Sequence, residues 1–303
     1  MKRVALLGDI HIYRLMTAPW RLLGKRLAGQ ANLWFSRRHR FQKSLIFNVL
    51  QRVEALKPDL LLLSGDLTTT ALHSEFEEAA TALRPIMSKI ETVIVPGNHD
   101  RYTMMSGWAR TAEKHFGRQV PRQFPHLRAL NDRWALLAVD AAMPRAISSR
   151  GRVGRDQLAR VRQLLAAEGG DPRSRGLIVL CHYPFSVPSQ VHWPWIHRLA
   201  DAEAVGELMV AASKEYGQLI YVHGHVHQPW WWQNGGAAGR LTVVNAGAPC
   251  CKNVRYPNGQ GFWQLDLPDD PADGFELVHH VPSWGSANQW DVESFSPGRT
   301  RIK

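Results

Sequence analysis

Short apolar runs alternate with stretches of helical spacing along most of the chain. Residues 60–63 are four leucines bounded by Pro58 and Gly65, and such a run predicts a strand that is buried on both faces. Residues 41–56 repeat apolar side chains at helical spacing, which predicts a helix with one face on a core. The alternation continues, with strands expected at 3–8, 92–95, 134–139, 176–181 and 218–222, and helices at 74–90, 154–168 and 196–216. This order is typical of a layered α/β fold.

The last quarter of the chain has a different pattern. Shorter strand-like runs at 229–233, 241–245, 262–266 and 275–280 are separated by glycine-containing turns, and they predict an antiparallel sheet. Residues 281–303 are polar, and we expect them to form a loosely packed tail. Earlier in the chain, Ser74 and Glu77 have the spacing of a capping box and predict a helix start.

Residues with the chemistry of metal ligands follow five of the predicted strands. Each has an ordinary explanation when taken alone, because Gly-Asp and Gly-Asn are common turn dipeptides. Their recurrence is informative, since open α/β sheets bind ligands beyond the carboxyl ends of their strands. A mixed oxygen and nitrogen donor set suits divalent Mn, Fe or Zn. The residues are Asp9 and His11, then Asp66, then Asn98, His99 and Asp100, then His182, and finally His225 and His227.

The charge of the chain is strongly positive. Lys and Arg number 37 against 26 Asp and Glu, for a formal net charge of +11, and this favours anionic partners. Eight of the basic residues lie in the segment 14–43, which has no acid and includes Trp20 and Trp34. Two interpretations stay open for this basic insertion. It is a solvated helical flap, or it is an amphipathic surface for an anionic membrane or substrate.

The cysteine content and the hydropathy bear on location. Three cysteines make no disulfide framework, which fits a reducing cytosol. Asp9 and His11 interrupt the apolar N-terminus before a signal-peptide core forms, and no apolar run approaches the ~20 residues of a membrane span. We therefore expect a cytoplasmic protein, with peripheral attachment to the inner face of the membrane as the alternative that the basic insertion leaves open.

The order of these motifs, D-x-H, G-D, G-N-H-D, H and G-H-x-H over residues 9–227, resembles the calcineurin-like metallophosphoesterase superfamily. The resemblance implies a four-layer αββα sandwich of two mixed β-sheets flanked by helices. It implies a metallophosphoesterase domain over 1–280, with 14–43 as an insertion and 281–303 as a C-terminal tail. Cys181 stands where many relatives have a second histidine, and the extra His223 is expected to be a strand residue.

The resemblance also implies a binuclear metal centre with two divalent ions (Mn²⁺, Fe²⁺/Fe³⁺ or Zn²⁺). His99 would be a catalytic residue outside the ligand set, and Asp100 would orient it. One ion would be held by Asp9, His11, Asp66 and His227, and the other by Asp66, Asn98, His182 and His225, with Asp66 shared.

The implied activity is metal-dependent hydrolysis of a phosphodiester or pyrophosphate bond in a small phosphorylated substrate, by attack of a metal-bridging hydroxide. The compact domain with Gly-Asn-His-Asp resembles 3′,5′-cyclic nucleotide phosphodiesterases. The basic insertion favours instead a peripheral membrane hydrolase of the UDP-2,3-diacylglucosamine type. A nuclease would use the same basicity, but no DNA-binding domain is appended, so nucleic acid is not expected. A non-catalytic scaffold would lack ligands or His99, and all are present. Nothing in the sequence defines an oligomeric state.

Overall fold

The structure is a computed structural model. It describes residues 1–15, 40–102, 107–145, 148–167, 172–189, 191, 193–234, 240–251, 261–283 and 289–297. Most of the basic insertion, residues 16–39, lies outside the described residues, as do 284–288 and 298–303 of the predicted tail.

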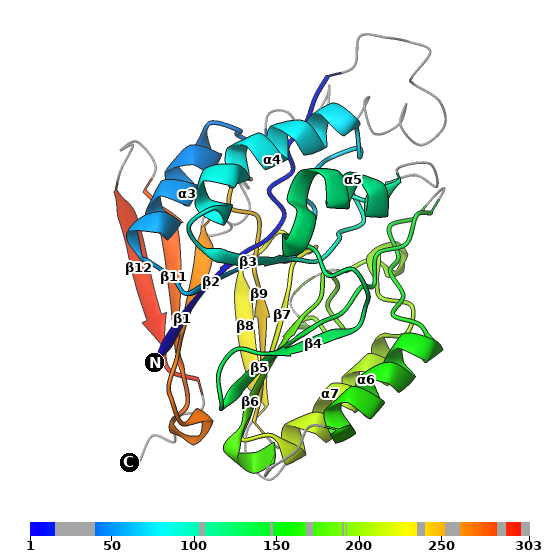
Figure 1. Ribbon diagram of the computed structural model, residues 1–303, viewed down its shortest axis with the longest axis vertical. Helices are drawn as coiled ribbons and strands as arrows, with labels where there is room; N and C mark the ends of the chain where they lie inside the picture. Colours follow the sequence, from blue (N-terminus) through cyan, green and yellow to red (C-terminus); the bar gives the residue numbers. More distant parts are fainter. Residues whose placement is uncertain are drawn as a thin grey trace.

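Two six-stranded sheets pack face to face (Figure 1). The first has the order β12-β11-β10-β1-β2-β3 and the second the order β4-β5-β6-β7-β9-β8. Strands β1 to β3 are parallel, as are β5, β6, β7 and β9, whereas β10 to β12, β4 and β8 run antiparallel to their neighbours. The strands are β1 (Lys2–Leu7), β2 (Leu60–Leu63), β3 (Glu91–Ile94), β4 (His126–Ala129), β5 (Trp134–Ala138), β6 (Gly176–Leu180), β7 (Gln218–His223), β8 (Trp230–Asn234), β9 (Leu241–Asn245), β10 (Phe262–Leu267), β11 (Glu276–Pro282) and β12 (Trp290–Phe295).

Helices cover the outer face of each sheet (Figure 1). On the first sheet lie α3 (Leu45–Ala55), α4 (His73–Met87) and α5 (Trp108–Phe116), and on the second lie α6 (Arg155–Ala167) and α7 (Ala202–Glu215). Short 3₁₀ turns are η3 (Gly117–Gln119), η4 (Pro172–Ser174), η5 (Trp195–His197) and η6 (Pro271–Asp273). The predicted four-layer αββα sandwich of two mixed sheets is therefore confirmed.

The four-leucine run shows why the sheets are stable. Leu60 and Leu62 belong to the core between the two sheets, whereas Leu61 and Leu63 belong to the core beneath α3 and α4. All four are at most 1% exposed, and each buried leucine contributes roughly 1.5–3 kcal/mol. The prediction of a strand buried on both faces is confirmed.

The helix predicted over 74–90 is present, but the predicted capping box of Ser74 and Glu77 is wrong. Helix α4 begins at His73. The buried carboxylate of Glu75, not that of Glu77, accepts hydrogen bonds from the backbone amides of Thr70 (2.8 Å) and Leu72 (3.1 Å). Glu75 therefore caps the helix and closes the loop that precedes it.

The late strands do not form an antiparallel sheet of their own. Strands β8 and β9 extend the second sheet, with β9 parallel to β7, and β10 and β11 extend the first sheet beside β1. Within the segment predicted as a tail, β12 pairs with β11 as an edge strand. The alternating pattern predicted the strands but not their partners.

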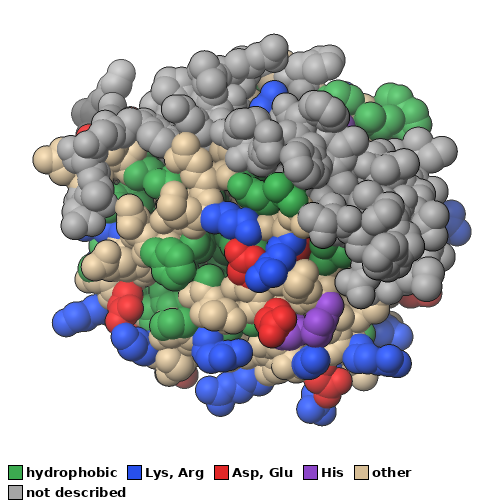
Figure 2. Space-filling model, turned by 90° about the horizontal axis from the view of Figure 1, so that it is seen from above, with side chains coloured by type: hydrophobic (Ala, Val, Ile, Leu, Met, Phe, Trp, Pro, Cys, Tyr) green, Lys and Arg blue, Asp and Glu red, His purple; other side chains and the backbone are tan. Residues whose placement is uncertain are grey.

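Both described ends of the basic insertion lie against one side chain of α4. Arg14 Nε and Lys43 Nζ are 3.0 and 2.8 Å from the carboxylate of Glu78. Figure 2 shows the molecule from above, where basic and acidic side chains lie next to one another beside exposed hydrophobic ones. No helix in the described part of the chain is long and apolar enough to cross a membrane.

Candidate metal centre

The loops that follow β1, β2, β3, β6 and β7 converge at one end of the sandwich. Two groups of ligand-type atoms lie there, each group within 4.8 Å, and Asp66 belongs to both. The first group is Asp9, His11, Asp66 and His227, and the second is Asp66, His182 and His225. Only His227 among them is half-buried, and the others are buried. The structure thus brings together six of the seven expected ligands in the two expected sets.

The seventh expected ligand, Asn98, lies beside the second group. Its Oδ1 atom is 3.1 Å from Nε2 of His182, and the carboxylate of Asp66 is 3.5 Å from the same nitrogen. Nδ1 of His182 is 2.7 Å from the carbonyl of Ser64, to which it donates. Nε2 of His182 thus faces two oxygen atoms, an arrangement that a metal ion or a proton on Nε2 satisfies.

The first group has a similar arrangement. Nε2 of His11 lies 3.0 Å from Nε2 of His227 and 3.7 Å from the carboxylate of Asp66. Two imidazole nitrogens and a carboxylate that face a common point are a typical donor set for Mn, Fe or Zn.

Backbone carbonyls orient the rings. Besides the bond from His182 to Ser64, Nε2 of His225 donates to the carbonyl of His197 at 2.9 Å, which leaves Nδ1 as the ligating nitrogen. Such outer hydrogen bonds select the tautomer of a metal-binding histidine.

The backbone is strained at the expected ligands. Seven non-glycine residues in the described chain have a left-handed φ, and five of them are expected ligands: Asp9 (38°), His11 (52°), Asp66 (53°), His225 (72°) and His227 (62°). Each costs on the order of 1–3 kcal/mol and persists only where the surroundings impose it. Strain concentrated on one cluster supports a functional role for that cluster.

Two glycines permit the close approach of the loops. A Cβ atom on Gly97 would lie 2.1 Å from Oδ1 of Asp66, and one on Gly224 would lie 3.0 Å from Oδ2 of Asp9. The Gly-Asn and Gly-His dipeptides are therefore required by packing against the carboxylates and not only by the turn.

The electrostatics of the centre favour bound cations. Burial raises the pKa of Asp9 well above its usual range, although His182 opposes the shift. Burial also acts to raise the pKa of Asp66, but His182 and His99 outweigh it, so that this pKa lies well below its usual range. Burial lowers the pKa of His182, yet Asp66 and Asp9 bring it to about 9.

Two carboxylate oxygens in the centre have no hydrogen-bond donor. Oδ1 of Asp9 and Oδ2 of Asp66 are buried and accept no hydrogen bond from any described residue. Buried anionic oxygens without donors are costly, and a divalent cation near each would satisfy them. The residues present therefore fit two divalent cations.

His99 lies beside the first group. Its ring is 4.8 Å from that of His11, and its backbone amide donates to Asp66 at 2.7 Å. Nδ1 of His99 is 2.6 Å from the carbonyl of Thr69, to which it donates, so Nε2 is the nitrogen that would meet a substrate.

Asp100 was expected to orient His99, and its contacts with the loop after β2 are the following. Its carboxylate accepts hydrogen bonds from the amide and hydroxyl of Thr68 and from the amide of Gly97. Thr68 precedes the Thr69 carbonyl that holds the His99 ring. Asp100 is therefore linked to the His99 ring by hydrogen bonds through Thr68 and Thr69.

Several groups around the centre are not predictable from sequence. The carbonyls of Ser64, Thr69 and His197 had no sequence signal, because any residue supplies a carbonyl. Tyr183 also packs on His225, with ring centroids 4.3 Å apart, and its position next to His182 was the available signal. His223 lies in β7 as expected, and burial lowers its pKa to about 3.

The fold of two mixed sheets flanked by helices is that of metallophosphoesterases. The calcineurin-like phosphoesterase model matches residues 2–229 of the 303. The chain belongs to the calcineurin-like phosphoesterase family, a class of metal-dependent phosphoester hydrolases.

One sequence and one solved structure show what the chain is similar to. The chain is 23% identical over 180 residues to a probable cyclic nucleotide phosphodiesterase of Vesicomyosocius okutanii subsp. Calyptogena okutanii (strain HA), a match that covers 59% of this chain and 67% of that one. A purple acid phosphatase from yellow lupin (Lupinus luteus) seeds superposes with a TM-score of 0.61 at 16% identity, over 97% of this chain and 53% of the plant chain. This chain thus spans about half the length of the plant phosphatase, and that likeness shows the fold alone.

Proposed function

We propose that the protein hydrolyses a phosphodiester bond of a small phosphorylated substrate with two divalent cations. The observation that carries this proposal is the pair of ligand groups that share the buried carboxylate of Asp66. Two divalent cations that are held side by side would repel each other, and a shared carboxylate such as that of Asp66 would offset this repulsion.

Each residue has a role in this proposal. Asp9, His11, Asp66 and His227 would hold one ion, and Asp66, Asn98, His182 and His225 would hold the other. When bound, two such ions supply Lewis acidity and lower the pKa of water to give a nucleophile at neutral pH. His99, oriented by Thr69, would stabilise charge on the phosphoryl oxygens and protonate the leaving oxygen through Nε2.

A 3′,5′-cyclic nucleotide is the substrate that we place first. The relative named as a probable cyclic nucleotide phosphodiesterase supports this choice, and the positive charge of the chain suits a phosphorylated substrate. The oxygen and nitrogen donors fit Mn, Fe or Zn.

A second candidate is hydrolysis of the pyrophosphate bond of a nucleotide-linked lipid at an anionic membrane. The supporting observation is the basic insertion, with eight basic residues and no acid in 14–43, which follows directly on the candidate ligand His11. Its described ends, Arg14 and Lys43, pair with Glu78 of α4.

Hydrolysis by metal-depleted and Mn²⁺-loaded protein tests both candidates. Bis-p-nitrophenyl phosphate reports the chemistry, and cyclic AMP and UDP-2,3-diacylglucosamine compare the substrates. Hydrolysis only with metal, and faster for cyclic AMP than for the lipid, supports the first candidate. Turnover that survives complete chelation contradicts the two-metal proposal.

Cosedimentation with anionic and neutral vesicles tests the membrane candidate separately. Binding to anionic vesicles should fall with salt and fall further when Arg37, Arg38 and Arg40 become Ala. A triple Ala variant at the exposed positions Arg155, Arg160 and Arg162 of α6 is the matched control. Equal binding to both vesicle types at low salt would exclude membrane recruitment.

A further inference from the structure

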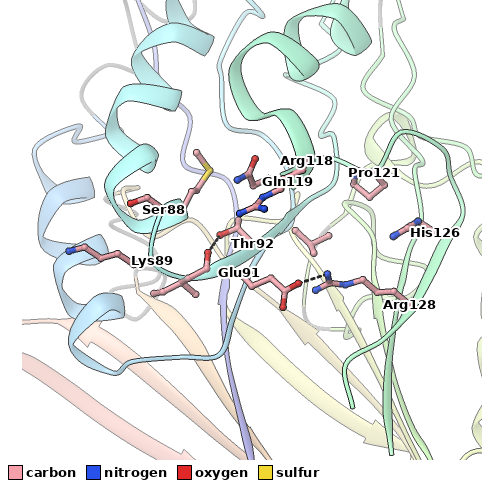
Figure 3. Close-up of a pocket in the computed structure, with 12 residues that line it drawn as sticks. Ser88, Lys89, Glu91, Thr92, Arg118, Gln119, Pro121, His126 and Arg128 are labelled. Carbon is pink, nitrogen blue, oxygen red and sulfur yellow. Dashed lines mark hydrogen bonds and ion pairs between the residues drawn. The ribbon is translucent and has the colours of Figure 1, made fainter. Parts of the chain in front are cut away.

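A pocket of about 430 Å³ lies away from the metal centre, at the opposite end of β3 from Asn98 and His99 (Figure 3). The edge strand β3 of the first sheet and the edge strand β4 of the second border it. The residues after α4 and those around η3 complete its wall. The pocket therefore lies in the seam between the two sheets and shares no residue with the candidate ligands.

The lining of the pocket carries an excess of positive charge. Its basic residues are Lys89, Arg118 and Arg128, and its one acid is Glu91. Lys89 pairs with Glu54 outside the pocket, and Arg128 pairs with Glu91 at 2.6 Å. Arg118 makes no ion pair within the described chain, so its charge is not neutralised there.

Arg128 has more donors than Glu91 uses. Its Nη1 atom bonds Glu91, whereas Nε and Nη2 are shielded from solvent and make no hydrogen bond with any described residue. The side chain as a whole is 27% exposed and Glu91 is 53% exposed, so both lie at the wall of the pocket. Buried guanidinium donors without a partner are costly, and a shift of the Arg128 side chain on binding would bring its Nε and Nη edge to the two oxygens of a phosphate.

Three cationic or titratable side chains from two segments line the pocket. Figure 3 shows Arg118 reaching in from η3, and His126 and Arg128 from β4. Partial burial and the charge of Arg128 lower the pKa of His126, as expected when the two groups face the same space. Two segments, η3 and β4, thus each contribute one arginine to the pocket, and two cationic side chains in one cavity suit an anion.

The remaining wall suits an organic group. Ile90, Val93 and Pro121 contribute apolar surface, and Thr92 and Gln119 contribute neutral polar atoms. The hydroxyl of Thr92 donates to the Ile90 carbonyl at 2.9 Å, which leaves its oxygen as an acceptor. The volume falls within the ~300–1,000 Å³ that is common for small-molecule sites.

We propose that this pocket is a second, non-catalytic binding site for a small organic phosphate. The phosphate group pairs with Arg118 and Arg128, and the organic part lies on Ile90, Val93 and Pro121. A ligand must compete with the carboxylate of Glu91 for Arg128. This competition favours a dianionic phosphate over a monoanionic carboxylate.

Isothermal titration of metal-depleted protein with adenosine 5′-monophosphate tests the proposal without any need for turnover. Arg118→Gln and Arg128→Gln should each weaken binding at least tenfold, which corresponds to about 1.4 kcal/mol. Arg160→Gln removes the same charge from the exposed face of α6 and should leave binding unchanged, as should Asp66→Asn in the metal centre. Arg118→Gln breaks no described interaction, so it separates ligand binding from any effect of Arg128 on folding.

Titration with adenosine and with inorganic phosphate distinguishes the parts of the ligand. The proposal predicts that the monophosphate binds more tightly than either part. It is overturned if wild-type protein binds no monophosphate, or if adenosine or inorganic phosphate binds as tightly. Loss of binding in Asp66→Asn with retention in both arginine variants would also overturn it, because the ligand would then occupy the metal centre.

Discussion

Substitution of Asp66 by Asn perturbs both ligand groups with a change of one atom. The amide keeps an oxygen to accept the 2.7 Å hydrogen bond from the His99 amide, but it removes the charge that the two groups share. Loss of a residue that merely hydrogen-bonds a metal ligand already weakens metal affinity about 10–100-fold. We therefore expect at least about a 100-fold loss at each site.

The effect on stability follows from ligand linkage. With Mn²⁺ at about 100 times its dissociation constant, each wild-type site adds about 2.7 kcal/mol to the free energy of unfolding. Two sites add about 5 kcal/mol, which raises Tm by about 10 °C at roughly 2 °C per kcal/mol for a chain of this size. When the affinity of each site is 100-fold weaker, the gain falls to about 0.4 kcal/mol per site. The two sites together then raise Tm by only about 2 °C.

Thermal unfolding with and without Mn²⁺ measures this difference directly. In metal-depleted protein Asp66→Asn should be less stable than wild type, because it removes the carboxylate charge that His182 and His99 stabilise, so the gain from Mn²⁺ is compared within each protein. Asp266→Asn is the matched control, since Asp266 is buried near the far end of the first sheet and bonds Arg3. The control should keep the full gain from Mn²⁺. An equal gain in Asp66→Asn would refute the shared-ligand argument.

Three other outcomes are expected. His99→Ala should retain both metals by elemental analysis and lose about 10²–10⁴-fold in kcat, whereas equal metal loss would make His99 a ligand. Gly97→Ala should lose metal affinity as Asp66→Asn does, because its Cβ would meet Asp66, and unchanged Mn²⁺ binding in a titration would contradict this. Burial raises the pKa of Asp140 to about 6 against the opposing effect of Arg101, so the folded state binds this proton more tightly than the unfolded state does. The protonated Asp140 contributes fully to stability below about pH 4, and this contribution is lost as the pH rises through 6. The fall in Tm over this range should be smaller in metal-depleted Asp140→Asn than in metal-depleted wild type. Identical pH profiles of Tm would refute this role of Asp140.

The element pattern predicted the strands better than their partners. Four leucines in sequence placed β2 between two cores, because a strand alternates its side chains across the sheet. The same alternation does not say which edge a strand joins, so β8 to β11 were assigned to one sheet and lie in two. The edge strands β4 and β12 were missed, since their half-exposed residues carry little apolar signal.

The candidate ligands could be anticipated because parallel strands place their carboxyl ends at one edge. Asp66 and Asn98 follow neighbouring strands, and His182 and His225 follow neighbouring strands of the other sheet. The supporting contacts could not be anticipated. The carbonyl of His197 reaches His225 across 28 residues, and the route from Asp100 to His99 depends on a loop whose conformation only the fold determines.

Titration of metal-depleted protein with Mn²⁺, following hydrolysis of bis-p-nitrophenyl phosphate and bound metal together, tests the central claim most directly. The proposal predicts no turnover without metal, and activity that rises to a plateau at two bound ions per chain. Asp66→Asn should fail to reach that plateau, whereas Asp266→Asn should reach it. Full turnover after exhaustive chelation, or a plateau in Asp66→Asn equal to that of wild type, would contradict the account.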